Sequence, residues 1–256
     1  MYHIRLATLL ICLAAPFMGE ARGETLRVTV LAEEFWPYSY VTNDDPVAHP
    51  DGILIDFVTE VLTHAGAEFE IRMLPWPRVM KHLSEDENQL VLTLIRTPER
   101  EAMAQWIGQV GQIDHALYRL RTNPDSAVRT LAAARPLSVA TVADDVAHDY
   151  LVGRGFERTV TSPNYLKGLE MLLRGRVDLY PGNSSLIGYQ CEQIPGGCED
   201  LEVAVRLVDL NQQLYLAMSN GTEAQVVARI SDSYQALIAS GRLAALRAAY
   251  FEDASE

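Results

Sequence analysis

The stretch TLIRTPEREAMAQW, residues 93–106, decides how this chain is interpreted, because it places an arginine just beyond a buried strand. The run before it, residues 89–95, is largely apolar and too short for a helix, so it predicts that strand. Thr97, Pro98 and Glu99 then supply an N-cap, a proline at the first helical position and an early acidic residue, which predict the start of a helix. In an α/β sheet, a strand that ends where a helix begins opens onto the crevice where ligands bind.

Arg100 is the candidate binding residue of this stretch. Its planar guanidinium can hold a carboxylate through two parallel, charge-assisted hydrogen bonds. The alternative is an arginine on a helix surface, paired with Glu99 or Glu101. The position after the strand favours the first interpretation, an anion-binding arginine that faces the crevice.

The remaining pattern predicts two α/β lobes. From residue 25 to residue 95, strands and helices alternate as βαβαβ, which predicts a parallel sheet with right-handed crossovers. A second βαβ unit spans residues 137–180. Two extended pieces, residues 113–121 and 213–219, suit strands that cross between the lobes, and residues 223–250 have helical spacing.

Residues 1–23 have the features of a secretory signal peptide. A positively charged start is followed by an apolar run over residues 6–17, and Ala21 and Gly23 precede a cleavage site. The apolar run is too short to span a bilayer, and no later segment reaches the roughly 20 apolar residues that spanning needs. Cys12 lies within the apolar run, so we expect no lipid anchor. We therefore expect an exported, periplasmic protein that is not a lipoprotein.

Composition narrows the classes of partner and cofactor. The formal net charge of −13 argues against nucleic acid and against anionic membrane surfaces, since both need a basic face. The 6 histidines show no metal-ligand spacing, and the chain has neither a phosphate loop nor a nucleophile elbow. We expect no metal and no cofactor.

Cys191 and Cys198 are the two cysteines outside the expected signal peptide, and they flank the sequence EQIPGG. A Pro-Gly-Gly turn can bring them together in an oxidising compartment, which predicts a disulfide. Two free thiols are the alternative.

Six short motifs follow one another along the chain: Leu26-Arg27-Val28, residues 35–40, residues 52–56, Pro75-Trp76, residues 97–100 and residues 175–178. In this order and spacing they resemble the bacterial extracellular solute-binding proteins of family 3, the polar amino acid receptors of ABC importers. The resemblance implies a periplasmic-binding-protein-like fold, with two α/β lobes, two crossing strands and a ligand cleft between the lobes. We expect lobe one at residues 24–114 plus 213–256, and lobe two, with the hinge strands, at residues 115–212.

The resemblance also implies site residues on lobe one. Phe35 matches the aromatic residue over the ligand, and Trp76 matches a second aromatic wall. Independently of the family, flat side chains beside strand ends offer contact area at low rotamer cost and can stack on a cation. Arg100 matches the arginine that binds the ligand's α-carboxylate. Thr93 and Ile95 stand at positions that assist this arginine in relatives, but Ile95 has no donor.

On lobe two, the sequence departs from the family at the ligand positions. Asp144 and Asp145 align with an anion-binding nest, where carboxylates would repel an anion; N-capping is the alternative role. Asn183 aligns with the aspartate that pairs with the ligand's ammonium, and an amide carries no charge. The full predicted ligand-binding set is Phe35, Trp76, Thr93, Arg100, Asp144, Asp145 and Asn183.

The sequence thus predicts a monomeric binding protein without catalytic residues. It would capture a small polar, amino-acid-like ligand and deliver it to an inner-membrane ABC permease. One alternative is an enzyme, because the family includes a cyclohexadienyl dehydratase; its acid would come from the cluster of Asp144, Asp145 and His148. Another alternative is a periplasmic sensor that presents its ligand-bound form to a signalling receptor.

Overall fold

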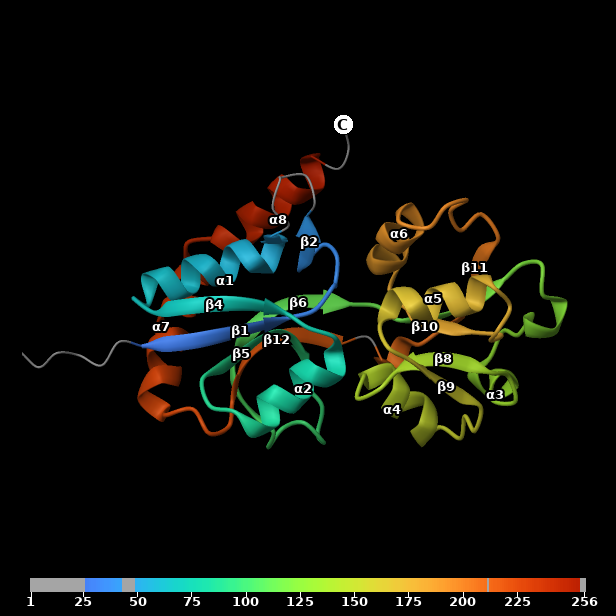
Figure 1. The fold of residues 1–256 in the computed structure, drawn as a ribbon, viewed down its shortest axis with the longest axis horizontal. Helices are drawn as coiled ribbons and strands as arrows, with labels where there is room; N and C mark the ends of the chain where they lie inside the picture. The colour runs from blue at the N-terminus through green and yellow to red at the C-terminus, as the bar shows by residue number, and fades with distance from the viewer. Residues whose placement is uncertain (1–25, 43–48, 211, 254–256) are drawn as a thin grey trace, which may run out of the picture.

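The computed structural model describes residues 26–42, 49–210 and 212–253. These residues form two α/β lobes that lie side by side (Figure 1). The expected signal peptide, residues 1–23 with Cys12, lies outside the described residues. In the described part of the chain, no helix is long and apolar enough to cross a membrane.

The first lobe is built on a five-stranded sheet with the order β4-β1-β5-β12-β6. Helices α1 and α8 lie on one side of this sheet and α2 on the other (Figure 1). The strands and helices of this lobe are β1 (Arg27–Ala32), β4 (Glu68–Met73), β5 (Gln89–Ile95), β6 (Ala104–Ile113), β12 (Gln212–Ser219), α1 (Ile53–His64), α2 (Trp76–Glu85), α7 (Ala224–Ala239) and α8 (Arg242–Asp253), with a hairpin of β2 (Tyr40–Thr42) and β3 (His49–Asp51).

The predicted βαβαβ unit is present. Strand β1 pairs in parallel with β4 and with β5, and α1 and α2 make the crossovers. Every residue of β5 is buried, as its apolar run predicts. This arrangement places the carboxyl ends of β1 and β5 at the same edge of the sheet.

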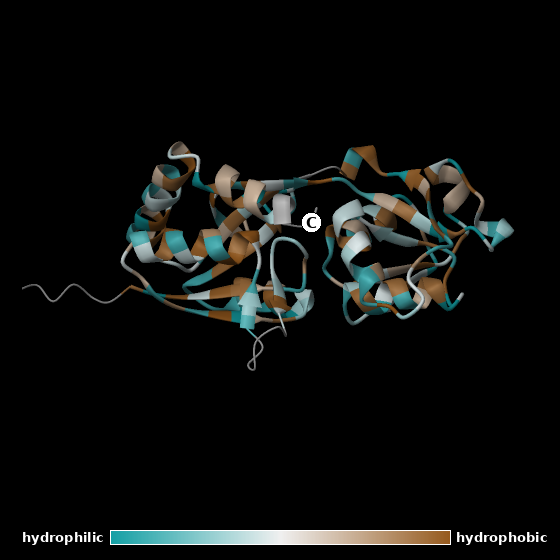
Figure 2. Cartoon of the chain, turned by 90° about the horizontal axis from the view of Figure 1, so that it is seen from above, coloured by the Kyte–Doolittle hydropathy of each residue, from teal (hydrophilic) through white to brown (hydrophobic). Residues whose placement is uncertain are grey.

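The second lobe has two small sheets, with the orders β10-β7-β11 and β8-β9. Its strands and helices are β7 (Ala116–Leu120), β8 (Val139–Val142), β9 (Thr159–Ser162), β10 (Tyr180–Gly182), β11 (Leu201–Arg206), α3 (Leu131–Ala134), α4 (Val146–Gly153), α5 (Tyr165–Leu173) and α6 (Ser184–Glu192), with 3₁₀ turns η1 (Pro124–Ser126) and η2 (Val208–Leu210). Hydrophobic residues recur along the strands of both lobes (Figure 2).

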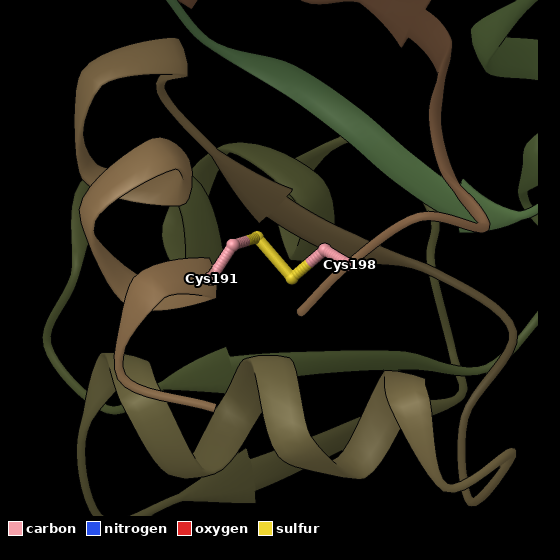
Figure 3. Close-up of a disulfide and its surroundings, with 2 residues drawn as sticks. All are labelled: Cys191 and Cys198. Atoms are coloured by element: carbon pink, nitrogen blue, oxygen red, sulfur yellow. A yellow bond between two sulfur atoms is a disulfide. The ribbon is translucent and has the colours of Figure 1, made fainter. Parts of the chain in front are cut away.

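The predicted disulfide is present in the second lobe. Cys191 on α6 is bonded to Cys198 in the loop before β11, with Cα atoms 5.4 Å apart (Figure 3). The turn between them has Gly196 and Gly197 at positive φ, 87° and 63°, a conformation that glycine adopts without steric cost. The Pro-Gly-Gly sequence therefore forms a turn that brings the two cysteines together, as predicted.

Two short links join the lobes. Asp114 and His115 connect β6 to β7, and the return link runs from η2 into β12. The backbone N–H of Leu207 donates to the carbonyl of His115 at 2.8 Å, which ties the links together. The extended piece at residues 213–219 was expected to cross between the lobes, but it lies inside the first sheet, antiparallel to both β5 and β6.

The helix predicted to start at Thr97 does not form. Residues 98–103 are turns, closed by bonds from the N–H of Arg100 to Thr97 O and from the N–H of Met103 to Arg100 O, both 3.0 Å. Strand β6 begins at Ala104 and pairs with β12, so the chain leaves the helical path after one turn. Arg100 still lies at the end of β5, as the sequence indicates.

Candidate functional site

Where the strand ends of the first lobe meet the second lobe, side chains enclose a space that we call the inner chamber. Its cavity volume is about 30 Å³, room for no more than a few water molecules. Six of the seven predicted ligand-binding residues line it, and Asp144 does not. The polar and aromatic lining residues are Glu33, Phe35, Trp76, Thr93, Arg100, His115, Asp145, Tyr165 and Asn183.

Arg100 is buried in this chamber, with 5% of its surface exposed. One guanidinium nitrogen donates to the backbone oxygen of Asp144 at 2.6 Å, and the guanidinium carbon lies 5.7 Å from the centre of the Trp76 ring. Of the two surface partners that the alternative named, Glu101 pairs with Arg96 instead, and the burial of Arg100 contradicts a position on the surface. Arg100 thus lies in the crevice and links the first lobe directly to the second.

Asp144 contributes a backbone oxygen rather than the side chain that the sequence pointed to. This oxygen also accepts from the indole N–H of Trp76 at 2.8 Å. Asp144 has φ of 60°, the left-handed conformation that aspartate and asparagine tolerate better than most residues. A strained turn thus presents one carbonyl to two side chains of the opposite lobe.

Asp145 caps helix α4, as the alternative interpretation proposed. Its Oδ1 accepts from the N–H of Ala147 at 2.8 Å, and its Oδ2 accepts from the Tyr165 hydroxyl at 2.8 Å. Burial, and then the negative charge of Asp145, raise the pKa of the Tyr165 hydroxyl well above its ordinary value. Both oxygens of Asp145 are therefore engaged within the second lobe, although the residue lines the chamber.

Asn183 is buried and caps helix α6, with Oδ1 accepting from the N–H of Leu186 at 2.9 Å. Thr93 and Ile95 also line the chamber, and the centre of the Phe35 ring lies 6.1 Å from that of Tyr165 on the second lobe. The structure thus brings the predicted residues of both lobes to one place.

Glu33, which follows the last residue of β1, is a lining residue that was not predicted from the sequence. Its side chain is buried, with 7% of the residue exposed. Burial, and then the nearby charge of Asp145, raise its pKa well above the ordinary value of 4.5, while Arg100 and the Tyr165 hydroxyl act in the opposite direction. The signal that could have found it is the one used for Arg100: a charged residue just beyond a buried strand.

His115, in the link between the lobes, is the histidine among the residues that line the chamber. Burial is the main cause that lowers the pKa of its imidazole, so the ring is neutral at pH 7. Its Nδ1 lies 3.0 Å from the backbone oxygen of Leu210 in the return link. Arg100 therefore supplies the positive charge here, facing the carboxyl groups of Glu33 and Asp145.

A second and larger space, the outer chamber, adjoins the first. Its cavity volume is about 490 Å³, within the range of small-molecule sites. Glu33, Trp76, Tyr165 and Leu186 line both chambers. The other lining residues of the outer chamber are Glu34, Val41, Met73, Leu74, Pro75, Val142, Asn164, Leu166, Tyr189, Gln190 and Gln193.

An aromatic stack joins the lobes beside this space. The rings of Trp36 and Tyr189 are 5.5 Å apart and inclined by only 4°, and Tyr40 lies 6.1 Å from Tyr189. Trp36 and Tyr40 belong to the first lobe, whereas Tyr189 is on α6 of the second.

Comparisons with known proteins agree with this arrangement. The family model described as "Bacterial extracellular solute-binding proteins, family 3" matches residues 26–253. No curated protein matches the chain.

Many solved structures share the fold. A histidine kinase sensor domain with similarity to periplasmic binding proteins is 21% identical, with 88% of this chain and 94% of that chain covered and a TM-score of 0.75. An arginine-, lysine-, histidine-binding protein from Geobacillus stearothermophilus is 13% identical, with 90% and 96% covered and a TM-score of 0.74. An amino acid ABC transporter substrate-binding protein from Streptococcus pneumoniae, bound to L-arginine, is 16% identical, with 88% and 94% covered and a TM-score of 0.72. At these identities the likeness shows the fold alone.

Proposed function

From the premise that the chain belongs to the bacterial extracellular solute-binding proteins of family 3, we propose that it captures a small polar solute between its lobes for import by an inner-membrane ABC permease. The observation that carries the proposal is the pair of chambers at the lobe interface, lined by residues of both lobes. A solute held there would couple its own binding to the closure of the lobes. The periplasmic location and the monomeric state remain predictions from the sequence.

The links between the lobes support this function. They are short segments at the ends of strands, the kind of position that absorbs the backbone rotation of a hinge. Across the cleft, the side chains of Arg100 and Trp76 donate hydrogen bonds to the backbone oxygen of Asp144. These bonds define how the two lobes meet. Binding and presentation of a solute need only such a cleft and a few fixed polar groups.

A thermal-shift screen of amino acids, amines, organic acids and peptidoglycan fragments tests the proposal. A solute present at 100 times its dissociation constant should stabilise the protein by about 2.7 kcal/mol. If no small solute in the panel shifts the unfolding temperature, capture of a small solute is contradicted.

A sensor role is the second candidate, because a histidine kinase sensor domain is among the structures that share the fold. Transport and sensing predict different defects in a strain that lacks the protein. Loss of labelled-solute uptake in a deletion strain would support transport. Normal uptake with loss of a transcriptional response to the solute would support sensing.

The residues predicted to supply the acid in the dehydratase alternative make other contacts in the structure. Asp144 offers its backbone oxygen, Asp145 caps α4, and Nδ1 of His148 lies 2.8 Å from the hydroxyl of Thr141. Glu33 and Glu34 are instead lining carboxyls whose pKa values burial raises, and Glu33 is the more deeply buried of the two. An assay for aromatic product from a cyclohexadienyl carboxylate, with Glu33→Gln as the variant, tests this activity; absence of product excludes it.

A further inference from the structure

Resting on the proposed function, we infer that the bound solute is an organic amine with an apolar body, held in the outer chamber by Glu33, Glu34 and Gln190, and that its recognition does not use a carboxylate held by Arg100. The inference names the chemical class of the solute and the residues that select it.

The charges of the outer chamber favour a cation. Among its lining residues, all within the described part of the chain, Glu33 and Glu34 are acidic and none is lysine, arginine or histidine. Glu33 is buried, whereas Glu34 is exposed and accepts a 3.2 Å hydrogen bond from the N–H of Val41. A carboxylate that is removed from water gains most from a cation placed beside it.

The side-chain amide oxygen of Gln190 offers the solute a buried hydrogen-bond acceptor. The residue is buried, with 3% exposed, and lines the outer chamber from helix α6. Within the described residues, its Oε1 has no hydrogen-bond partner. A buried acceptor without a partner carries an unrelieved desolvation penalty, so it favours a solute that brings an N–H group.

The walls fit an apolar body. Met73 and Leu74 on the first lobe and Leu166 on the second give the chamber an apolar lining, and Trp76 and Tyr189 add ring faces. Such faces attract cations as well as apolar groups. The cavity volume of about 490 Å³ accommodates a small organic molecule.

The inner chamber opposes the alternative, a carboxylate bound to Arg100. Arg100 already donates to Asp144, faces Glu33 and Asp145, and the cavity volume there is about 30 Å³. A solute carboxylate would add a third negative group to a buried site with a single arginine. The lining of the outer chamber, in contrast, includes no lysine, arginine or histidine that would repel a cation.

A matched series tests the inference by isothermal titration calorimetry. Phenethylamine, 2-phenylethanol and 3-phenylpropionate share one body and differ in the head group, and isopentylamine, isopentanol and 4-methylpentanoate repeat the comparison with an aliphatic body. We expect at least one amine to bind about tenfold or more tightly than its alcohol, the scale of a charge-assisted hydrogen bond. We expect the carboxylates to give no binding heat.

Variants connect this preference to the chamber. Glu33→Gln and Glu34→Gln should each weaken amine binding about tenfold and leave the alcohol unchanged. Gln190→Leu should weaken the amine as well. Glu192→Gln is the matched control, because Glu192 is an exposed carboxylate on the same helix that lines neither chamber. Because Glu34 is exposed, its variant is expected to fold even if a core variant does not.

The inference is overturned if a carboxylate outbinds its amine, if neither amine binds at about 10 mM, roughly ten-thousandfold above micromolar affinity, or if both glutamate variants bind the amine as tightly as wild type does. If an α-amino acid binds, Arg100→Ala abolishes that binding and the outer-chamber variants do not affect it, the proposed function stands and this inference fails. If no solute of any class binds, the proposed function itself fails.

Discussion

The burial of Glu33 is the feature of the site that is hardest to predict from the sequence. A pair of glutamates after a strand is ordinarily solvated, whereas the first of this pair is buried near Asp145 and Tyr165 of the second lobe. Arg100 was predictable because a strand followed by turn residues places it at the sheet edge, whatever the later packing. The difference is that burial of Glu33 depends on residues far along the chain, such as Asp145 and Tyr165.

The raised pKa of Glu33 predicts a pH-dependent effect of Glu33→Gln. A carboxyl with a folded-state pKa above its unfolded value of 4.5 stabilises the fold fully below pH 4.5, and this contribution is lost as pH rises through the raised pKa. Glutamine does not titrate, so the variant avoids the loss. Its unfolding temperature should match wild type near pH 4 and exceed it at pH 8. Glu192→Gln serves as the control, and a difference that is flat or reversed with pH would refute the assignment.

Asp144 predicts a second effect at the residue scale, because its left-handed backbone serves the lobe interface. Asp144→Ala should destabilise the protein by about 1–2 kcal/mol, the cost of this conformation for a residue with a Cβ and no local polar compensation. Asp144→Gly should remain within about 0.5 kcal/mol of wild type, since glycine adopts positive φ freely. Urea denaturation of both variants measures the difference. An alanine variant as stable as the glycine variant would show that the backbone is not strained.

At the scale of elements, the strands and helices that follow from local sequence patterns were predicted correctly. Features that depend on pairing between distant segments were not. The alternation from β1 to β5 gave the parallel unit, because each strand and helix has its own periodicity. The capping signal at Thr97 predicted a helix, but pairing of β6 with β12, more than a hundred residues away, determined the outcome. No local sequence pattern indicates that β12 inserts between β5 and β6.

Helix α7 packs on β6 at a position that tolerates no side chain. A Cβ on Gly108 would overlap with ring carbons of Tyr234, whose hydroxyl donates to Gln109 O at 2.6 Å. Gly108→Ala should therefore destabilise the protein by about 1–3 kcal/mol through overpacking. Gly153→Ala is the control, because among the described residues nothing beyond its own neighbours and helix backbone lies within 4 Å of the added Cβ. Thermal unfolding compares them, and equal stabilities would contradict the close packing.

For the whole molecule, the stack of Trp36 on Tyr189 predicts how the lobes are held together. Tyr189→Ala removes an aromatic pair worth about 0.5–1.5 kcal/mol beyond its buried area, and it removes this from the interface alone. The lobe-open population should rise, which small-angle X-ray scattering detects as a larger radius of gyration. Tyr150→Ala on α4, where Tyr150 contacts Arg154 of its own lobe, is the matched control. Equal radii in both variants would show that the stack does not hold the lobes.

The position of β12 also governs when the first lobe can assemble. The strand between β5 and β6 is supplied by residues that a ribosome adds only after the entire second lobe. Until then, β5 and β6 each present an unpaired edge, and such edges are templates for pairing with other chains. The second lobe is continuous in sequence between the links, so it can fold first, as domains generally do in order of synthesis. A growing chain of this protein therefore needs protection of its N-terminal half until nearly the last residues arrive.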